Sequence, residues 1–252
     1  MAQHSLIEIR DLKKVYMRGR ETVEALRGVS LDIAPGEFVS VMGPSGCGKS
    51  TLLHVIGGID RSTGGSVRVN STDLGAASED QLTRFRRDHV GFIFQFYNLL
   101  PTLSALENVE LPLVALNYPR PARRKMARAA LDLVGLADRA LHRPTELSGG
   151  QQQRVAIARA LVSNPKVILA DEPTGDLDSA SAQMVVDIMR ELNRDLGLTF
   201  VVVTHNPEVG AAGTRIIRLR DGQVVDDEAI HPIAPAASVQ FDATPSALNR
   251  SR

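Results

Sequence analysis

Short apolar runs alternate along the chain with longer segments in which apolar positions recur every three to four residues. Runs that are apolar almost throughout predict buried strands over residues 38–42, 90–94, 167–170 and 200–204. Partial alternation of apolar and polar positions predicts half-buried strands over 6–9, 25–33 and 66–70. Two more strands, 215–219 and 223–225, flank Asp221-Gly222, a dipeptide typical of a tight hairpin. We therefore expect an antiparallel β layer beside a core of parallel strands.

Helical periodicity fills most of the remaining chain. The predicted helices cover 51–56, 78–88, 104–116, 121–134, 150–163 and 178–196. Ser78 and Asp178 are good N-cap residues for two of them, and Gly197 follows the last. The helices in the middle of the chain predict a helical subdomain over about 96–163, inside one domain of residues 5–228. The remainder, 229–252, is rich in Ala, Pro and Ser and predicts a disordered tail.

Composition and charge restrict the range of partners. The 252 residues are 43% hydrophobic and 23% charged, and 29 Lys plus Arg balance 29 Asp plus Glu. This balance predicts no nucleic-acid partner. We interpret the basic cluster 123–128 as a solvated helix face, so it predicts none either. The sequence shows no signal-peptide pattern, no apolar run long enough to cross a bilayer, and a single cysteine. We expect a cytoplasmic protein that reaches the inner face of the membrane through a partner.

A glycine-rich loop follows the strand at 38–42 and fits the phosphate-loop pattern G-x-x-x-x-G-K-[ST]. Its residues are Gly43, Pro44, Ser45, Gly46, Cys47, Gly48, Lys49, Ser50 and Thr51. The glycines allow the backbone to curl so that N–H groups point inward at an anion, which the N-terminus of the next helix also attracts. Lys49 would reach the β- and γ-phosphates, and the Ser50 hydroxyl would bind Mg²⁺. The flanking strand and helix favour this over a turn that matches the pattern by chance.

Polar residues follow three other buried strands. These residues are Gln95, the pair Asp171-Glu172, and His205. Ligands of open parallel sheets bind beyond the carboxyl ends of the strands, so we expect all of these side chains to lie near the phosphate loop. Asp171 would hold Mg²⁺ and Glu172 would act on the attacking water. Gln95 would serve Mg²⁺ or that water and His205 the γ-phosphate, although each could also be a plain polar residue at a strand end.

A second glycine-rich loop, Leu147-Ser148-Gly149-Gly150-Gln151, opens the helix at 150–163. Ser148 is a good N-cap, and the two glycines leave backbone N–H groups accessible, so this loop is a second candidate anion site. The chain has only one nucleotide loop, so the second site needs a separate explanation. It is either a helix cap or a contact for a nucleotide that another subunit binds.

Taken together and in this order, these motifs resemble the ATP-binding-cassette (ABC) ATPases over about residues 5–228. The LSGGQ sequence at 147–151 is the most discriminating, because it separates this family from kinases and G proteins. The resemblance implies a P-loop NTPase fold of the α/β class: a RecA-like core, an antiparallel β layer and a helical signature subdomain. It implies ATPase activity with ATP and Mg²⁺, in which Gln95, His205 and Lys49 assist the catalytic Glu172 and in which Ser50, Gln95 and Asp171 hold the metal. Tyr16 falls where the family has an aromatic residue that stacks on adenine.

The resemblance also implies partners. Two cassettes of this family face head to tail, so Ser148, Gly149, Gly150, Gln151 and Asp178 would contact the nucleotide of the other copy, and we expect a homodimer. Residues 15–16, 23–26, 94–101 and 148–161 look like the lipoprotein-releasing and macrolide-exporter group. That group implies integral membrane permease subunits, docking near Gln95–Pro101, that export or extract lipoprotein, drug or peptide. A cell-division-type ATPase, which regulates an envelope process without transport, is the alternative.

Overall fold

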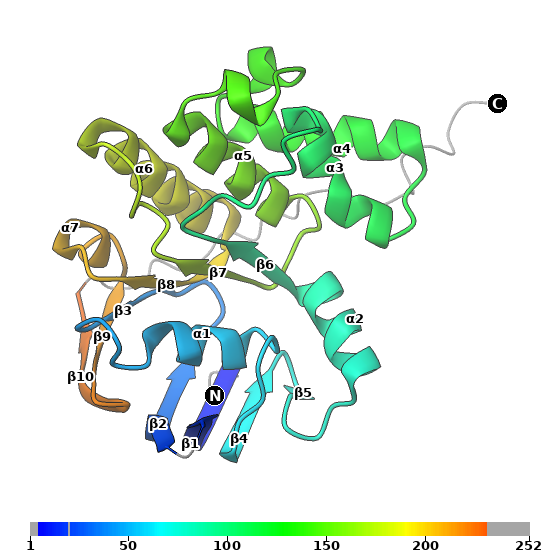
Figure 1. Ribbon diagram of the computed structural model, residues 1–252. Coiled ribbons are helices and arrows are strands. Elements are labelled where there is room, and N and C mark those ends of the chain that lie inside the picture. Colours follow the sequence, from blue (N-terminus) through cyan, green and yellow to red (C-terminus); the bar gives the residue numbers. More distant parts are fainter. Residues whose placement is uncertain (1–4, 20, 231–252) are drawn as a thin grey trace.

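Two β-sheets with helices packed between and above them form the fold (Figure 1). The computed structural model describes residues 5–19 and 21–230. The smaller sheet is antiparallel and has the order β2 (Glu21–Ile33), β1 (Ile7–Arg18), β4 (Gly64–Val69), β5 (Thr72–Asp73). The larger sheet has the order β10 (Gln223–Ala229), β9 (Arg215–Arg220), β3 (Phe38–Met42), β8 (Thr199–Thr204), β7 (Val167–Asp171), β6 (Val90–Ile93). All of its strands are parallel except β10.

The larger sheet has a hydrophobic core on each of its faces. In β8, Val201 and Val203 point into one core, and Phe200 and Val202 point into the other. The first core also contains α1 (Lys49–Ile56) and the inner face of the smaller sheet. The second contains the apolar faces of the helices drawn above the sheet in Figure 1. Burial on both faces explains why these parallel strands are apolar throughout.

Most helices lie where periodicity predicted them. They are α2 (Glu79–His89), α3 (Ala105–Ala115), α4 (Arg120–Leu133), α5 (Gly149–Leu161), α6 (Ser179–Leu196) and the short α7 (Pro207–Gly210), with 3₁₀ turns at Ala137–Arg139 and Pro144–Glu146. Ser78 and Asp178 cap α2 and α6 as predicted, and Gly197 ends α6 in the left-handed conformation. Helices α3, α4 and α5 all lie between β6 and β7 in the chain. In the described parts of the chain, no helix has the length and apolarity needed to span a bilayer.

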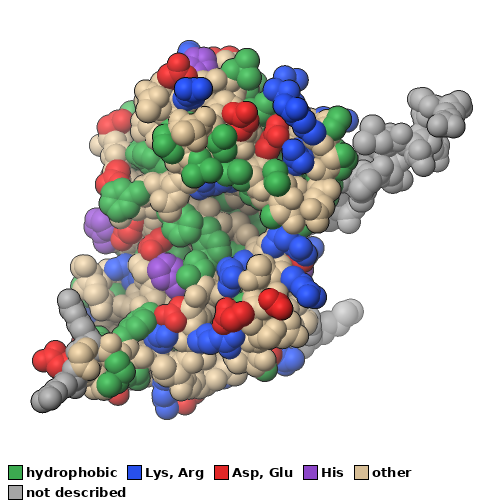
Figure 2. All heavy atoms as spheres, turned by 45° about the vertical axis from the view of Figure 1, so that its right-hand side comes forward, with side chains coloured by type: hydrophobic (Ala, Val, Ile, Leu, Met, Phe, Trp, Pro, Cys, Tyr) green, Lys and Arg blue, Asp and Glu red, His purple; other side chains and the backbone are tan. Residues whose placement is uncertain are grey.

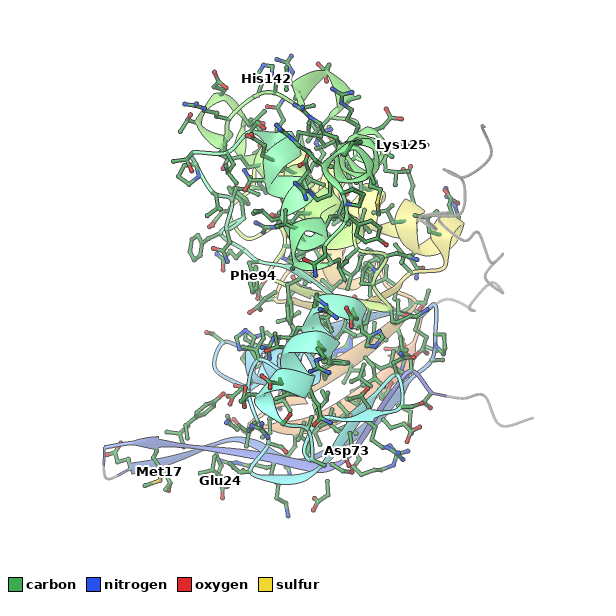
Figure 3. All side chains as sticks on the ribbon, turned by 90° about the vertical axis from the view of Figure 1, so that its right-hand side faces the viewer. Met17, Glu24, Asp73, Phe94, Lys125 and His142 are labelled. Carbon is green, nitrogen blue, oxygen red and sulfur yellow. The ribbon has the colours of Figure 1, made fainter. Side chains whose placement is uncertain are left out.

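The hairpin of β1 and β2 is longer than predicted. The pattern indicated short strands at 6–9 and 25–33, but β1 continues to Arg18 and β2 begins at Glu21. Register shifts along β1, with Asp11 at a φ of 45°, interrupt the alternation on which that prediction depended. The outer part of the hairpin extends away from the body of the molecule, with the exposed Met17 near its end (Figure 3).

The carboxyl ends of four parallel strands are in register. Met42 of β3 pairs with Thr204 of β8, Val203 of β8 with Asp171 of β7, and Ala170 of β7 with Ile93 of β6. The predicted polar residues therefore begin at one edge of the sheet. At the C-terminus, β10 continues to Ala229, one residue beyond the predicted boundary, and the Ile230 N–H donates to Thr214 O. The predicted disordered tail lies, from residue 231 on, outside the described residues.

Candidate active site

The first glycine-rich loop joins the end of β3 to the start of α1. Gly43, Gly46 and Gly48 all have positive φ, as the prediction of a curled backbone required. At Gly48, where φ is 104°, an added Cβ would lie 2.4 Å from Ala25 O, so only glycine fits. Cys47 is buried, and its carbonyl accepts a 3.0 Å hydrogen bond from Gly222 N–H. The loop is thus fixed from outside by β2 and by the β9–β10 turn.

Lys49 is the first residue of α1 and is only 7% exposed. Its ammonium donates to two carbonyls of its own loop, Gly43 O at 2.9 Å and Pro44 O at 3.0 Å. A cation bound only by neutral carbonyls keeps its full charge for an anion. The loop therefore presents an ammonium group beside a helix N-terminus, which together favour a phosphate group.

Ser50 and Asp171 meet across the gap between α1 and β7. The Ser50 hydroxyl donates to Asp171 Oδ1 at 3.0 Å, and both residues are half-buried. Burial raises the pKa of the Asp171 carboxyl, and the Ser50 bond lowers it less. In the described residues, no cationic side chain forms an ion pair with Asp171, although its carboxylate is sheltered from water. Two hard oxygen ligands with one unneutralised charge fit a divalent cation such as Mg²⁺.

Glu172 follows Asp171 and has a backbone conformation that is rare for its residue type, with φ at 45°. Its carboxylate accepts a 2.9 Å hydrogen bond from His205 Nδ1, because a carboxylate cannot donate. The Glu172 side chain is 19% exposed and the His205 side chain 71%. The structure thus brings both predicted residues together and bonds them to each other, a contact that the sequence did not indicate.

Gln95 lies just beyond β6 on the same edge. Its Nε2 donates to Asp176 Oδ1 at 3.2 Å, in the loop between Glu172 and α6. An added Cβ at Gly175 would lie 3.1 Å from the Gln95 amide, so this loop packs closely on it. The side chain thus connects two segments that border the candidate site.

A cleft of about 570 Å³ lies at this edge of the sheet. Its walls come from the phosphate loop, from β2 and from the ends of β6, β7 and β8. They are formed by Val23, Glu24, Ala25, Ser45, Gly46, Gly48, Lys49, Ser50, Thr51, Gln95, Glu172 and His205. A cavity of this volume is large enough for a nucleotide. Sequence reasoning predicted the polar wall, but the part contributed by β2 follows only from the fold.

Tyr16 comes from β1, where it pairs with Val23 of the cleft wall. Its hydroxyl donates to Asp60 Oδ2 at 2.6 Å, and the other Asp60 oxygen accepts from Lys14 Nζ at 2.6 Å. The Lys14 ammonium also lies 4.6 Å from the centre of the Tyr16 ring. Burial raises the pKa of the Tyr16 hydroxyl, and the Asp60 bond raises it further. The ring is held in place by partners that sequence reasoning missed.

The second glycine-rich loop lies at the start of α5, and its residues 148–151 do not line the described cleft. Ser148 is the N-cap, as predicted: its Oγ accepts from Gln151 N–H, and Gln151 Oε1 accepts from Ser148 N–H. Asp178 is likewise outside the cleft and caps α6 through Ser181. Within one chain, these residues therefore have no direct part in the site around Lys49.

Two residues of α5 that the sequence analysis did not single out contact the site's framework. Gln153 is completely buried and donates to Phe94 O and Pro173 O. Arg159 donates to Tyr97 O and Asn98 O. Gln153 shares a helical stripe with Gly150 and Ile157, so its burial could have been read from periodicity, but its partners could not.

Comparisons with known proteins show the family to which this chain belongs. The ABC transporter family profile covers residues 26–175. The chain is 50% identical over 219 residues to an ABC transporter ATP-binding protein of Thermotoga maritima, covering 87% of this chain and 93% of that protein. It is 52% identical over 230 residues to the macrolide export ATP-binding/permease protein MacB of Rhodopseudomonas palustris, covering 91% of this chain but 35% of MacB. The chain thus spans about a third of the length of this second relative.

Solved structures of ABC transporter cassettes are also similar to this chain. A dimeric structure of MJ0796, a bacterial ABC transporter cassette, has a TM-score of 0.83 at 48% identity over 90% of this chain and 99% of that one. A second dimeric structure of MJ0796, in a post-hydrolysis state bound to ADP and Pi, has a TM-score of 0.82 at 47% identity with the same coverage.

The fold and the cleft define a P-loop NTPase, as predicted. The chain belongs to the ABC transporter family and is an ATP-binding and ATP-hydrolysing subunit of this type. The comparisons favour the transporter interpretation over the regulatory, cell-division-type alternative.

Proposed function

We propose that the cleft around Lys49 binds the triphosphate of ATP and that Glu172 is the general base for its hydrolysis. The observation that carries this proposal is the convergence of Lys49, Glu172, Gln95 and His205 on one cleft. Lys49 and the loop N–H groups would bind the phosphates. Glu172 would take a proton from the attacking water, and His205 would hold the carboxylate in position. Tyr16 would stack on the adenine.

Ser50 and Asp171, with Gln95, would hold Mg²⁺. Their oxygen atoms, and the charge of Asp171, which forms no ion pair among the described residues, fit a hard divalent cation. Such a cation binds proteins through few carboxylates and keeps several waters. When bound, the ion supplies positive charge that stabilises the phosphate oxygens.

The variant Glu172→Gln tests this function. The amide keeps the shape of the side chain but cannot accept a proton, so hydrolysis should fall by about two orders of magnitude or more while ATP binding is kept. Glu191→Gln is the matched control, because Glu191 is exposed on α6 and lies outside the cleft. A Glu172→Gln enzyme that hydrolyses ATP at the wild-type rate would exclude this residue as the base.

The complete site requires two copies of the chain. Ser148, Gly149, Gly150, Gln151 and Asp178 would contact the nucleotide of the second copy, because in their own chain they lie outside the cleft. The dimeric structures of MJ0796 support a homodimer for this chain. ATP binding would close this dimer and hydrolysis would open it.

A membrane permease would bind at a groove between two parts of the molecule, α2 with β6 on one side and the helices α3 and α5 on the other. A groove of about 440 Å³ lies there, and in Figure 2 the surface between the upper and lower halves is hollowed and bordered by Lys and Arg side chains. Phe94 lies at this junction in Figure 3. The groove is lined by Arg86, Arg87, Val90, Gly91, Phe92, Phe94, Asn98, Pro112, Ala115, Arg159, Ala160 and Ser163.

The chemistry of this groove suits a short amphipathic segment that carries a carboxylate. Its floor is mainly apolar, and burial lowers the pKa of Arg159, whose guanidinium contacts only carbonyls in the described residues. Phe96, 71% exposed, lies next to the groove in sequence. Phe96→Asp should abolish co-purification of the chain with its permease from detergent-solubilised membranes. Leu141→Asp should not, because Leu141 is equally exposed but precedes His142, which lies at the far end of the helical part of the molecule (Figure 3).

Named relatives suggest the class of cargo. MacB proteins are macrolide export proteins by name, and we propose that this chain likewise powers export or extraction of a drug, lipoprotein or peptide at the inner face of the membrane. Identification of the membrane protein that co-purifies with the chain, followed by transport assays in vesicles that contain both, tests this assignment. Altered cell division without any transport defect would favour the regulatory alternative instead.

A further inference from the structure

Gln153 is a polar side chain that the proposed mechanism does not use, although it is completely buried. It lies on the second turn of α5 and reaches out of the helix to two backbone carbonyls. Its Nε2 is 3.3 Å from Phe94 O and 2.5 Å from Pro173 O. Its Oε1 has no hydrogen-bond partner among the described residues, which is costly for a buried amide.

Both acceptors adjoin residues of the candidate site. Phe94 directly precedes Gln95, and Pro173 directly follows Glu172. One amide group thus joins the backbone at the root of Gln95 to the backbone beside Glu172. The two segments come from neighbouring strands, β6 and β7, so Gln153 bridges them just beyond the point where their ladder ends.

The backbone at Glu172 needs such a restraint. Its φ of 45° is sparsely populated for a residue with a side chain, and it persists only where the surroundings over-determine it. The Glu172 N–H donates to Val203 O at 2.9 Å, and its carbonyl accepts from Gly175 N–H at 3.0 Å. Gln153 adds a restraint on the next peptide, at Pro173 O.

Helix α5 holds the segment after Gln95 as well. Arg159 donates to Tyr97 O at 2.7 Å and to Asn98 O at 2.5 Å. Tyr97 in turn packs on the first turn of α5, since an added Cβ at Gly149 would lie 2.9 Å from its hydroxyl. The helix whose N-terminus carries Ser148 is therefore tied to residues 94–98 at several points, and through Gln153 to Pro173, the residue after Glu172.

We propose that Gln153 is a positioning residue: it aims Glu172 and Gln95 and links both to the position of the α5 N-terminus. Docking of that N-terminus on the nucleotide of a second copy would be relayed to the general base of its own chain. The inference rests on the proposed role of Glu172. It predicts that removal of the Gln153 amide slows hydrolysis and leaves nucleotide binding unchanged.

The variant Gln153→Met tests this proposal. Methionine is similar in length to glutamine, so packing is kept. It removes the Oε1 atom and both donated hydrogen bonds. We expect kcat for ATP to fall between about 10-fold and 100-fold, because small displacements of a catalytic group are that costly, with KM changed less than about twofold. Gln183→Met is the control, because Gln183 is exposed on α6 and its amide donates to Asp187 Oδ1, away from both glycine-rich loops.

A double-mutant cycle with Glu172→Gln separates positioning from a structural role. If Gln153 acts through Glu172, the variant Glu172→Gln/Gln153→Met should hydrolyse ATP in single turnovers as slowly as Glu172→Gln alone. A further fall equal to that of Gln153→Met in the wild-type background would overturn the proposal, as would a Gln153→Met enzyme with normal kcat. If Gln153→Met does not fold, Gln153→Asn, whose amide is one methylene shorter, should show the same selective loss of kcat.

The outcomes also distinguish this proposal from the proposed function. Normal hydrolysis by Glu172→Gln would overturn the role of Glu172 itself. Slow hydrolysis by Glu172→Gln combined with normal hydrolysis by Gln153→Met would overturn only the positioning role.

Discussion

The Glu172 carboxylate and the His205 imidazole are hydrogen-bonded at 2.9 Å, from the ends of adjacent strands β7 and β8. The bond fixes one carboxylate oxygen, and the His205 backbone N–H lies 3.4 Å from the other. The bond uses Nδ1 of the His205 ring, so Nε2 takes no part in it. Glu172 and His205 are therefore held together in the wall of the cleft.

His205→Ala should therefore lower kcat by about two orders of magnitude, because the variant leaves the Glu172 carboxylate without its side-chain partner. Binding of ATP should change little, since Lys49 and the loop remain intact. Steady-state hydrolysis and equilibrium nucleotide binding measure the two quantities. His142→Ala is the control, because His142 contacts Arg139 and lies far from this edge (Figure 3). A loss of hydrolysis in that variant too would point to a general effect of histidine removal.

The burial of the Asp171 carboxyl predicts that the stability of the fold depends on pH. Its pKa is raised above 3.8 by burial, so the folded chain binds this proton more tightly than the unfolded chain does. Its contribution to stability in the absence of ligands should therefore fall as pH rises from the unfolded value through the raised folded value. Asp171→Asn should remove that fall and melt at a higher temperature near neutral pH. Thermal unfolding from about pH 4 to about pH 8 measures this.

The exposed Asp187 on α6 provides the comparison for Asp171, since Asp187→Asn should leave the pH profile unchanged. Metal affinity should follow the opposite trend from stability, because the cation binds the ionised carboxylate: Mg²⁺-dependent nucleotide binding should weaken as pH falls. Asp171→Asn with wild-type melting at every pH would contradict the burial argument.

The Lys14–Asp60–Tyr16 contact predicts a combined effect on stability and on nucleotide affinity. Lys14 is 8% exposed, so Asp60→Asn leaves a buried ammonium without its counter-charge and should cost about 1–3 kcal/mol. The Tyr16 ring should also be held less firmly, which raises KM for ATP without changing kcat. Asp11→Asn is the control: Asp11 pairs with Lys13 on the surface, and its loss should cost less than about 1 kcal/mol. An unchanged KM in Asp60→Asn would separate Tyr16 from the nucleotide.

Ser148→Arg tests the two-copy site. It should abolish hydrolysis but leave ATP binding by the isolated subunit intact, because Ser148 lies outside its own cleft. Mixed with inactive Lys49→Ala subunits, it should recover activity, since a mixed dimer contains one site with both intact loops. Ser78→Arg controls for the lost capping box, because Ser78 caps α2 in the same way, at a cost of about 1 kcal/mol. Absence of recovery on mixing would argue against a head-to-tail dimer.

Elements with local signals could be predicted from the sequence. The buried strands at 38–42 and 200–204, the caps at Ser78 and Asp178 and the Asp221-Gly222 hairpin follow from burial on both faces and from turn chemistry, which need only neighbouring residues. Convergence of Lys49, Gln95, Glu172 and His205 was also predictable, because parallel strands place their carboxyl ends at one edge.

Which side chains bond across that edge depends on the tertiary structure. The pairing of Glu172 with His205, the anchoring of Tyr16 by Asp60 and the reach of Gln153 to Phe94 and Pro173 connect residues 20 to 59 positions apart. The long β1–β2 hairpin was missed for a related reason: bulges shift the register and hide the alternation. Such contacts depend on how strands and helices pack, and a pattern of neighbouring residues carries no record of distances in space.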